Sequence, residues 1–231
     1  MKVKRIITLA LLFLTTTIVV FASGTEEDVE ILYKYQFNVD LQFKLAKDLK
    51  LNIAPEIRFN DGYDKFLLDG GLSYKTFGCI TWGATYRLVV DRVESATSSY
   101  DAFGFGANNY DSELYHRYAF NVTYKDKFGD FTPSFRLRYN NYADDEIDDE
   151  AYLRYKAKVE YDIPKCKVTP FLSAEAYQDL SKGEFSKVRY STGIDLKCGK
   201  DSALSFDYKL DFFLLKYKNA NIFSVGYKYK F

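Results

Sequence analysis

Apolar and polar residues alternate along almost the whole chain with a period of two. From Ile31 to Leu45 every odd position is apolar, and every even position from 34 to 44 is polar. Successive side chains of a β-strand point to opposite faces, so this segment has one apolar and one polar face. A soluble β-sandwich packs its apolar faces together, whereas a transmembrane barrel turns them toward lipid and keeps its polar faces inside.

The same alternation predicts eleven strands, each close to or above the roughly 9–11 residues that a tilted membrane-spanning strand needs. Short connections alternate with longer or more polar ones, as in outer-membrane barrels with short periplasmic turns and longer external loops. We therefore expect an all-β fold, an antiparallel up-and-down transmembrane β-barrel of about 10–12 strands. The predicted strands are 31–45, 49–59, 66–75, 80–91, 115–125, 131–140, 151–161, 168–178, 185–197, 204–213 and 222–231.

Two further expectations concern the number of strands and one long connection. An odd strand number is unusual in bacterial barrels, so closure is expected to need one strand more or one strand fewer. The segment 92–114 is rich in Ser, Gly, Asn and Asp, and we expect it to form a long loop.

The two ends of the chain indicate export and membrane assembly. Basic residues at positions 2, 4 and 5 precede an apolar stretch over 6–21, and small residues occupy 22–24. This pattern predicts a signal peptide over 1–24, followed by an outer-membrane barrel domain over 25–231. Tyr227, Tyr229 and Phe231 share one strand face, and this aromatic ending resembles the signal that the barrel-assembly machinery of Gram-negative outer membranes reads.

Charge and composition narrow the class of partner. The chain has 32 basic and 32 acidic residues, and without the predicted signal peptide the balance is 29 to 32. That balance argues against nucleic-acid binding, which favours a basic domain. The 21 Tyr and 20 Phe suit strands and the aromatic belts at a membrane interface. Expected partners are outer-membrane lipid, lipopolysaccharide, the barrel-assembly machinery and small anionic solutes.

The polar faces of three consecutive predicted strands are rich in cations. If these faces line the lumen, they form one basic stripe on the inner wall, because neighbouring strands lie about 4.8 Å apart. Glu175, Asp195, Asp207 and Asp211 would face it from later strands. The stripe consists of Arg117, Arg136, Arg138, Arg154, Lys156 and Lys158, with Arg189 extending it from a later strand.

This stripe leaves two functional alternatives open. In the first, it lines a narrow, anion-leaning, porin-like channel for small solutes, since rings of Arg and Lys select anions. In the second, Arg–Glu pairs fill the lumen, and the protein is a closed structural or surface-binding barrel without transport activity. Side chains fill the lumen of an eight-stranded barrel, whereas a sixteen-stranded barrel has an aqueous pore. A strand number between these values does not decide between the two alternatives.

We expect neither an enzyme nor a metal or cofactor site. His116 is the only histidine, and its parity places it on the lipid-facing side, away from a catalytic partner in the lumen. The acidic segment 144–150 lacks the glycine and spacing of an EF-hand calcium loop, which favours a solvated loop. Cys166 and Cys198 are predicted to face each other at the short-turn end, where an oxidising periplasm would allow a disulfide, with Cys79 left free.

Four segments carry a family resemblance: VEYDIPKCKVTPF (159–171), FRLRY (135–139), LSAE (172–175) and VGYKYKF (225–231). They resemble an uncharacterised family of bacterial outer-membrane proteins that is labelled only as a domain of unknown function. The likeness covers most of the chain after residue 24 and is firmest from 131 onward. It implies an outer-membrane barrel and no particular activity. In size and basic lumen alone, the chain also resembles small porins for acidic oligosaccharides.

Overall fold

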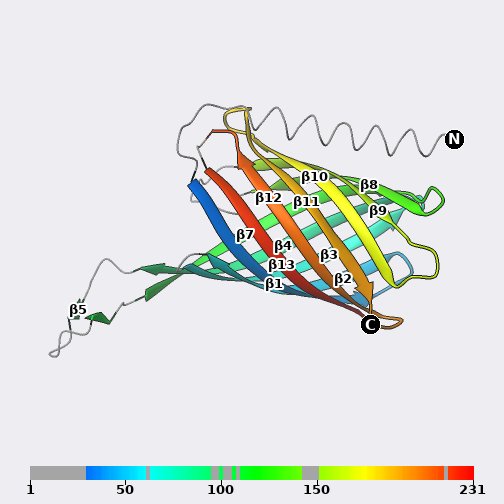
Figure 1. Cartoon of the computed structure of the whole chain (residues 1–231), viewed down its shortest axis with the longest axis horizontal. Helices are drawn as coiled ribbons and strands as arrows, with labels where there is room; N and C mark the ends of the chain where they lie inside the picture. Colours follow the sequence, from blue (N-terminus) through cyan, green and yellow to red (C-terminus); the bar gives the residue numbers. More distant parts are fainter. Residues whose placement is uncertain are drawn as a thin grey trace.

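Eleven strands of the computed structural model form one closed barrel (Figure 1). The structure describes residues 30–60, 63–94, 99–100, 106–107, 110–141, 151–215 and 218–231. A separate two-stranded sheet pairs β5 (Ser99–Tyr100) with β6 (Gly106–Ala107). The barrel strands are β1 (Glu30–Lys44), β2 (Leu49–Asn60), β3 (Tyr63–Thr76), β4 (Ile80–Glu94), β7 (Tyr110–Lys125), β8 (Phe131–Asn140), β9 (Tyr152–Tyr161), β10 (Val168–Asp179), β11 (Phe185–Lys197), β12 (Ser202–Phe213) and β13 (Lys218–Lys230).

The barrel closes through one parallel pair of strands. All other neighbouring strands pair antiparallel, but β1 pairs in parallel with β13, from Glu30 opposite Lys218 to Gln42 opposite Lys230. In an up-and-down barrel with an odd strand number, the first and last strands run the same way, so their pair must be parallel. The predicted all-β barrel of 10–12 strands is confirmed, and the expectation of one strand more or fewer is wrong.

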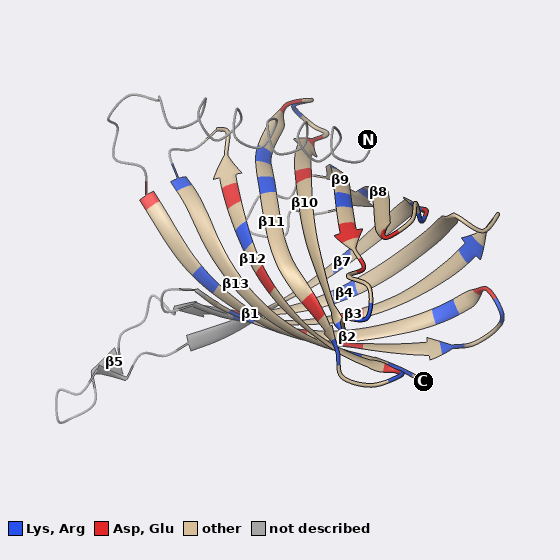
Figure 2. Cartoon of the chain, turned by 45° about the vertical axis from the view of Figure 1, so that its right-hand side comes forward, with Lys and Arg blue, Asp and Glu red and all other residues tan. Residues whose placement is uncertain are grey.

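The apolar face of each strand points out of the barrel and the polar face points in. On β1, Tyr33, Tyr35 and Phe37 are each about half exposed, whereas Gln36 between them is 4% exposed. Trp82, the single tryptophan of the chain, is 54% exposed on the outside of β4. Charged residues lie along the length of the strands as well as at their ends (Figure 2). A barrel surrounded by hydrocarbon presents this inside-out arrangement.

The loop that we expected over 92–114 is shorter in the structure. β4 continues to Glu94 and β7 begins at Tyr110, and these two residues face each other in a continuous antiparallel pair. β8 joins β7 only from Ala119 onward, so the β4–β7 hairpin extends past β8. Polar composition led to the wrong expectation, because strand pairing here overrides turn-forming residue types. The predicted signal peptide and the acidic segment 144–150 lie outside the described residues.

No helix in the described part of the chain is long and apolar enough to cross a membrane.

Candidate functional site

Charged side chains of the inner wall form several groups, and four of these groups are together called the lumen belt below. The first cluster joins β8, β9 and β10 around Glu175. Its Oε1 lies 3.1 Å from both Arg136 Nη2 and Arg154 Nε, and its Oε2 lies 3.9 Å from Lys156 Nζ. Arg154 Nη2 also donates a hydrogen bond of 3.0 Å to the Tyr177 hydroxyl. One carboxylate therefore ties three strands together.

The second cluster joins β11 and β12 around Asp211. Arg189 donates from Nε and Nη2 to the two carboxylate oxygens at 2.5 and 2.7 Å, which is the bidentate geometry that a guanidinium favours. Lys187 Nζ lies 3.2 Å from Oδ2 of Asp211. The Tyr177 ring connects this cluster to the first, because Lys187 Nζ and Arg154 Cζ lie 4.4 and 4.6 Å from its centroid.

The third cluster lies on β1, β2 and β12. On β2, Arg58 Nε donates to Glu56 Oε1 at 2.6 Å. Lys209 of β12 donates to Gln36 Oε1 of β1 at 2.8 Å and so reaches past β13, which lies between these two strands. Glu56 is also within electrostatic reach of Arg87 and Lys209. Charges on separate strands thus influence one another across the inner wall.

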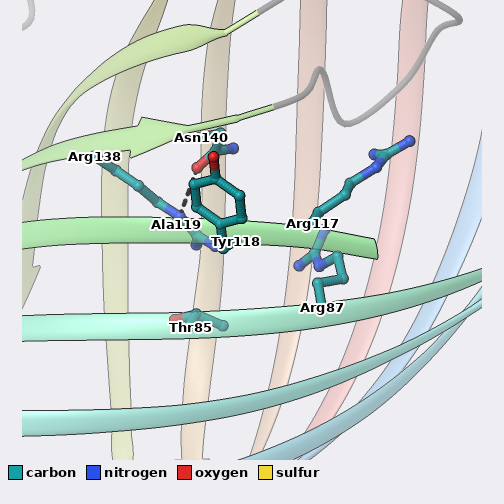
Figure 3. Close-up of a pocket in the computed structure, with 7 residues that line it drawn as sticks. All are labelled: Thr85, Arg87, Arg117, Tyr118, Ala119, Arg138 and Asn140. Atoms are coloured by element: carbon teal, nitrogen blue, oxygen red, sulfur yellow. Dashed lines mark hydrogen bonds between the residues drawn. The ribbon is translucent and has the colours of Figure 1, made fainter. Parts of the chain in front are cut away.

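The fourth cluster lies on β3, β4, β7 and β8. Arg87 donates from Nε and Nη2 to Asp69 at 2.6 and 2.8 Å. Arg138 Nε donates to Asn140 Oδ1 at 2.9 Å (Figure 3). Together with Arg117, these two arginines line a cavity of 10 Å³ in the wall. Three arginines from three neighbouring strands therefore line one small cavity.

Cations outnumber carboxylates in the lumen belt, and the buried members of the belt lie in its first and second clusters. Asp211 is 1% exposed, Glu175 3% and Arg154 6%. Such low exposure means that neighbouring side chains, and not open water, surround these groups. The belt has four carboxylates, Glu56, Asp69, Glu175 and Asp211. Its ten cations are Arg58, Arg87, Arg117, Arg136, Arg138, Arg154, Lys156, Lys187, Arg189 and Lys209.

The structure places all seven residues of the predicted basic stripe on the inner wall and six of them in the belt. The seventh, Lys158, lies nearer the short-turn end, where its Nζ is 2.9 Å from Glu160 Oε1 and 3.9 Å from the centroid of Phe171. The seven predicted residues leave out four belt cations, Arg58, Arg87, Lys187 and Lys209. Each has the inward parity of its strand, so the alternation that revealed the stripe could also have found them.

The barrel end with the short turns contains a cavity of 390 Å³ with charges of both signs. Lys125, Lys197, Asp195 and Glu160 line it, and Lys125 Nζ donates to Glu160 Oε2 at 2.6 Å. In the turns of this end, Lys127 donates to Asp162 at 2.8 Å. That hydrogen bond lowers the pKa of the Asp162 carboxyl and raises the pKa of Lys127. The wall at this end of the barrel therefore has no strong excess of one sign of charge.

The three cysteines are free thiols in the structure, so the expected bond between Cys166 and Cys198 is not formed. The Cys166 sulfur accepts a hydrogen bond from Val168 N at 3.5 Å, and the Cys198 thiol donates to Leu196 O at 3.5 Å. Each sulfur thus turns back onto its own strand, although strand pairing places both residues at the same barrel end.

The remaining predicted residues lie on the outer face. His116 contacts the Tyr86 hydroxyl through Nδ1, and both side chains are exposed. At the chain end, the Phe231 ring stacks on Phe43 with centroids 4.5 Å apart and meets Tyr229 edge-on at 4.6 Å. Tyr227 is 38% exposed on the same face. Among the described residues, no group of three or more His, Cys, Asp or Glu is placed to hold a metal ion.

Comparisons with known proteins give a family and a general fold likeness. A family model described as "Protein of unknown function (DUF2490)" matches residues 33–220, which confirms the resemblance noted in the sequence. No curated protein matches. The chain is similar to the translocator domain of the autotransporter NalP from Neisseria meningitidis, at 13% identity and TM-score 0.40, over 73% of this chain and 70% of that chain. It is also similar to the beta domain of the Bordetella autotransporter BrkA, at 13% identity and TM-score 0.38, over 75% of this chain and 80% of that chain.

Proposed function

The chain belongs to the DUF2490 family, whose function is unknown, and we propose that it forms an outer-membrane β-barrel with a narrow lumen that favours small anions. The proposed membrane location is supported by the outward face of the barrel. Phe37, Trp82 and Phe120 are each 49–56% exposed there, which would be costly in water over a whole barrel surface. In hydrocarbon the same surface is favourable, and closure satisfies the backbone hydrogen bonds.

The preference for anions rests on one observation, the excess of cations in the lumen belt. The belt has ten cations and four carboxylates, and even with Asp207, which is within electrostatic reach of Lys209 and Lys156, cations remain in excess on this part of the inner wall. In a narrow, poorly hydrated passage, charge on the wall acts strongly on a passing ion. A cation would be repelled there, whereas an anion would be stabilised.

The burial of the same belt favours a second candidate, a closed structural barrel. Asp211 and Glu175 are almost fully buried although they lie on the wall of the lumen. Carboxylates that are held by two or three cations hold neighbouring strands together, which is a structural role that needs no passage of solutes. This candidate predicts a stable barrel without conductance.

Planar-bilayer recordings with a salt gradient test the proposal. We expect stepwise currents whose reversal potential indicates anion preference. The double variant Arg136→Ala plus Arg138→Ala should move the permeability ratio toward unity, because it removes two belt cations. Lys34→Ala is the matched control, since Lys34 has the inward parity of β1 but does not belong to the belt. If correctly folded protein gives no current, the result would contradict the proposal and support the closed barrel.

A further inference from the structure

A groove of 330 Å³ crosses the outer face of β3, β4 and β7, which are neighbours in the barrel (Figure 1). Gly70 of β3 and Ala84 of β4 lie at its base, where they provide little or no side chain. Leu72, Tyr86 and Phe120 stand around them and are each 48–56% exposed. None of the residues that line the groove carries a charge. The groove is therefore an apolar depression in the outward face of the barrel.

The fold of β3 does not by itself require glycine at position 70. The pairing of β3 with β2 and with β4 continues through Gly70 without a bulge, and its φ is not in the left-handed region. A Cβ added there would meet no atom within 4 Å. Glycine inside a strand costs stability, and it often marks a place where a ligand or another chain approaches closely. Gly70 therefore indicates that a partner fills the groove.

A polar pair lies at the edge of the groove. The hydroxyl of Tyr86, which lines the groove, contacts Nδ1 of His116, and both side chains are exposed on the outer face. The neutral pair has two polar hydrogens, one on the hydroxyl and one on the ring, and uses one of them between its members. One donor is left in either tautomer, and the described residues offer it no acceptor. In hydrocarbon such a donor is costly unless a ligand accepts from it.

The groove and the polar pair together fit an amphiphile with an apolar chain and a hydrogen-bond acceptor near one end. A lipid acyl chain has both parts, because the carbonyl of its ester linkage accepts hydrogen bonds. The groove is also continuous with the apolar outer face, since Trp82 and Tyr74 are paired directly beside it and are 54% and 53% exposed. A chain in the surrounding hydrocarbon could therefore enter the groove without crossing water.

The position of the polar pair gives the direction of the chain. His116 lies closer than the lining residue Tyr118 to Tyr110, where β7 begins at the end of the barrel opposite the short turns. An ester carbonyl at the pair would thus lie toward that end, which is the external side of the proposed outer-membrane barrel. The acyl chain would run from there over Ala84 toward the short turns.

We propose that this groove binds one acyl chain of a lipid in the external leaflet, whose ester carbonyl accepts a hydrogen bond from the pair of Tyr86 and His116. The inference rests on the membrane location in the proposed function and does not depend on a conducting lumen. It distinguishes one face of the barrel from the rest, because a lipid in the groove is held in place whereas lipids elsewhere on the outer face exchange freely.

Photo-crosslinking in vesicles tests the groove. The probe is phosphatidylcholine with a diazirine in one acyl chain, present as a minor component of unlabelled phosphatidylcholine vesicles that contain the folded protein. We expect several-fold more label on peptides that carry Leu72 and Phe120 than on the outer face of β10 to β12. Gly70→Leu should lower this label to the level found elsewhere, because its side chain fills the groove. Ala174→Leu is the matched control, since Ala174 is exposed between two buried residues of β10, outside the groove.

Two further variants test the proposal if Gly70→Leu does not fold. Ala84→Leu fills the groove from β4 and should also remove the excess label. Tyr86→Phe plus His116→Phe keeps the apolar walls but removes the donor, and it should reduce the label at the groove. Unchanged label at the groove in these variants would contradict the proposal.

The pattern of labelling separates this inference from the proposed function. Even labelling around the barrel would overturn the groove and leave the membrane location intact. No labelling of the folded protein at any outward position would contradict both. Native mass spectrometry of the detergent-purified protein covers the remaining occupant: a dimer that Gly70→Leu dissociates and Ala174→Leu does not would place a second copy of the chain in the groove and overturn the proposal.

Discussion

At the residue scale, Glu175 is the carboxylate of the lumen belt that contacts the most cations. Its side chain is 2% exposed and contacts Arg136, Arg154 and Lys156. A buried ion pair is a weak source of net stability, but removing one partner leaves charges that nothing neutralises. Substituting the carboxylate alone is therefore the change that most clearly reveals what this cluster contributes to stability.

We predict that Glu175→Gln lowers the free energy of unfolding by about 3 kcal/mol, the usual cost of breaking a buried ion pair on one side. Reversible urea unfolding in the presence of lipid or detergent, followed by heat-dependent gel mobility, measures this change. Asp162→Asn is the control, because its partner Lys127 is exposed and solvent screens the pair. Equal effects of the two substitutions would contradict the importance of the Glu175 cluster.

At the scale of the elements, alternation alone predicted the strands and their facing. The polar positions of β1, such as Gln36 and Asn38, point inward as expected, and most strand ends lie within a few residues of the prediction. The parallel closure was harder to predict, because the alternation of apolar and polar residues in β13 fits a parallel neighbour as well as an antiparallel one. The start of β7 at Tyr110 was missed because its pairing with β4 outweighs local turn-forming composition.

The parallel seam makes a specific prediction for cross-linking. In a background with the three native cysteines replaced by serine, Tyr35→Cys plus Phe223→Cys should form a disulfide, because these residues are directly paired on β1 and β13. Tyr35→Cys plus Tyr229→Cys should not, since Tyr229 lies opposite Leu41. Gel mobility of the denatured, non-reduced protein measures the bond. Cross-linking of the second pair in place of the first would contradict parallel closure.

At the scale of the whole molecule, the sequence identified six of the ten cations of the lumen belt but not their partners. Which acid meets which base depends on strand register, and the lengths of turns do not fix register from sequence alone. Glu175, for example, lies opposite Lys156 on one side and Arg189 on the other. Arg189 instead pairs with Asp211, so even correct register leaves the choice to side-chain geometry. The cation excess is consequently a property of the assembled barrel.

Trp82 offers the most direct test of the central claim that hydrocarbon covers the outer face of this barrel. It is the only tryptophan, it lies near the short-turn end of β4, and its side chain points outward. The measurement is its fluorescence in vesicles of brominated lipid. We predict blue-shifted emission and strong quenching, greatest when bromine lies near the headgroups, because tryptophan favours the membrane interface. Water-like emission that brominated lipid leaves unchanged in the folded protein would contradict the account.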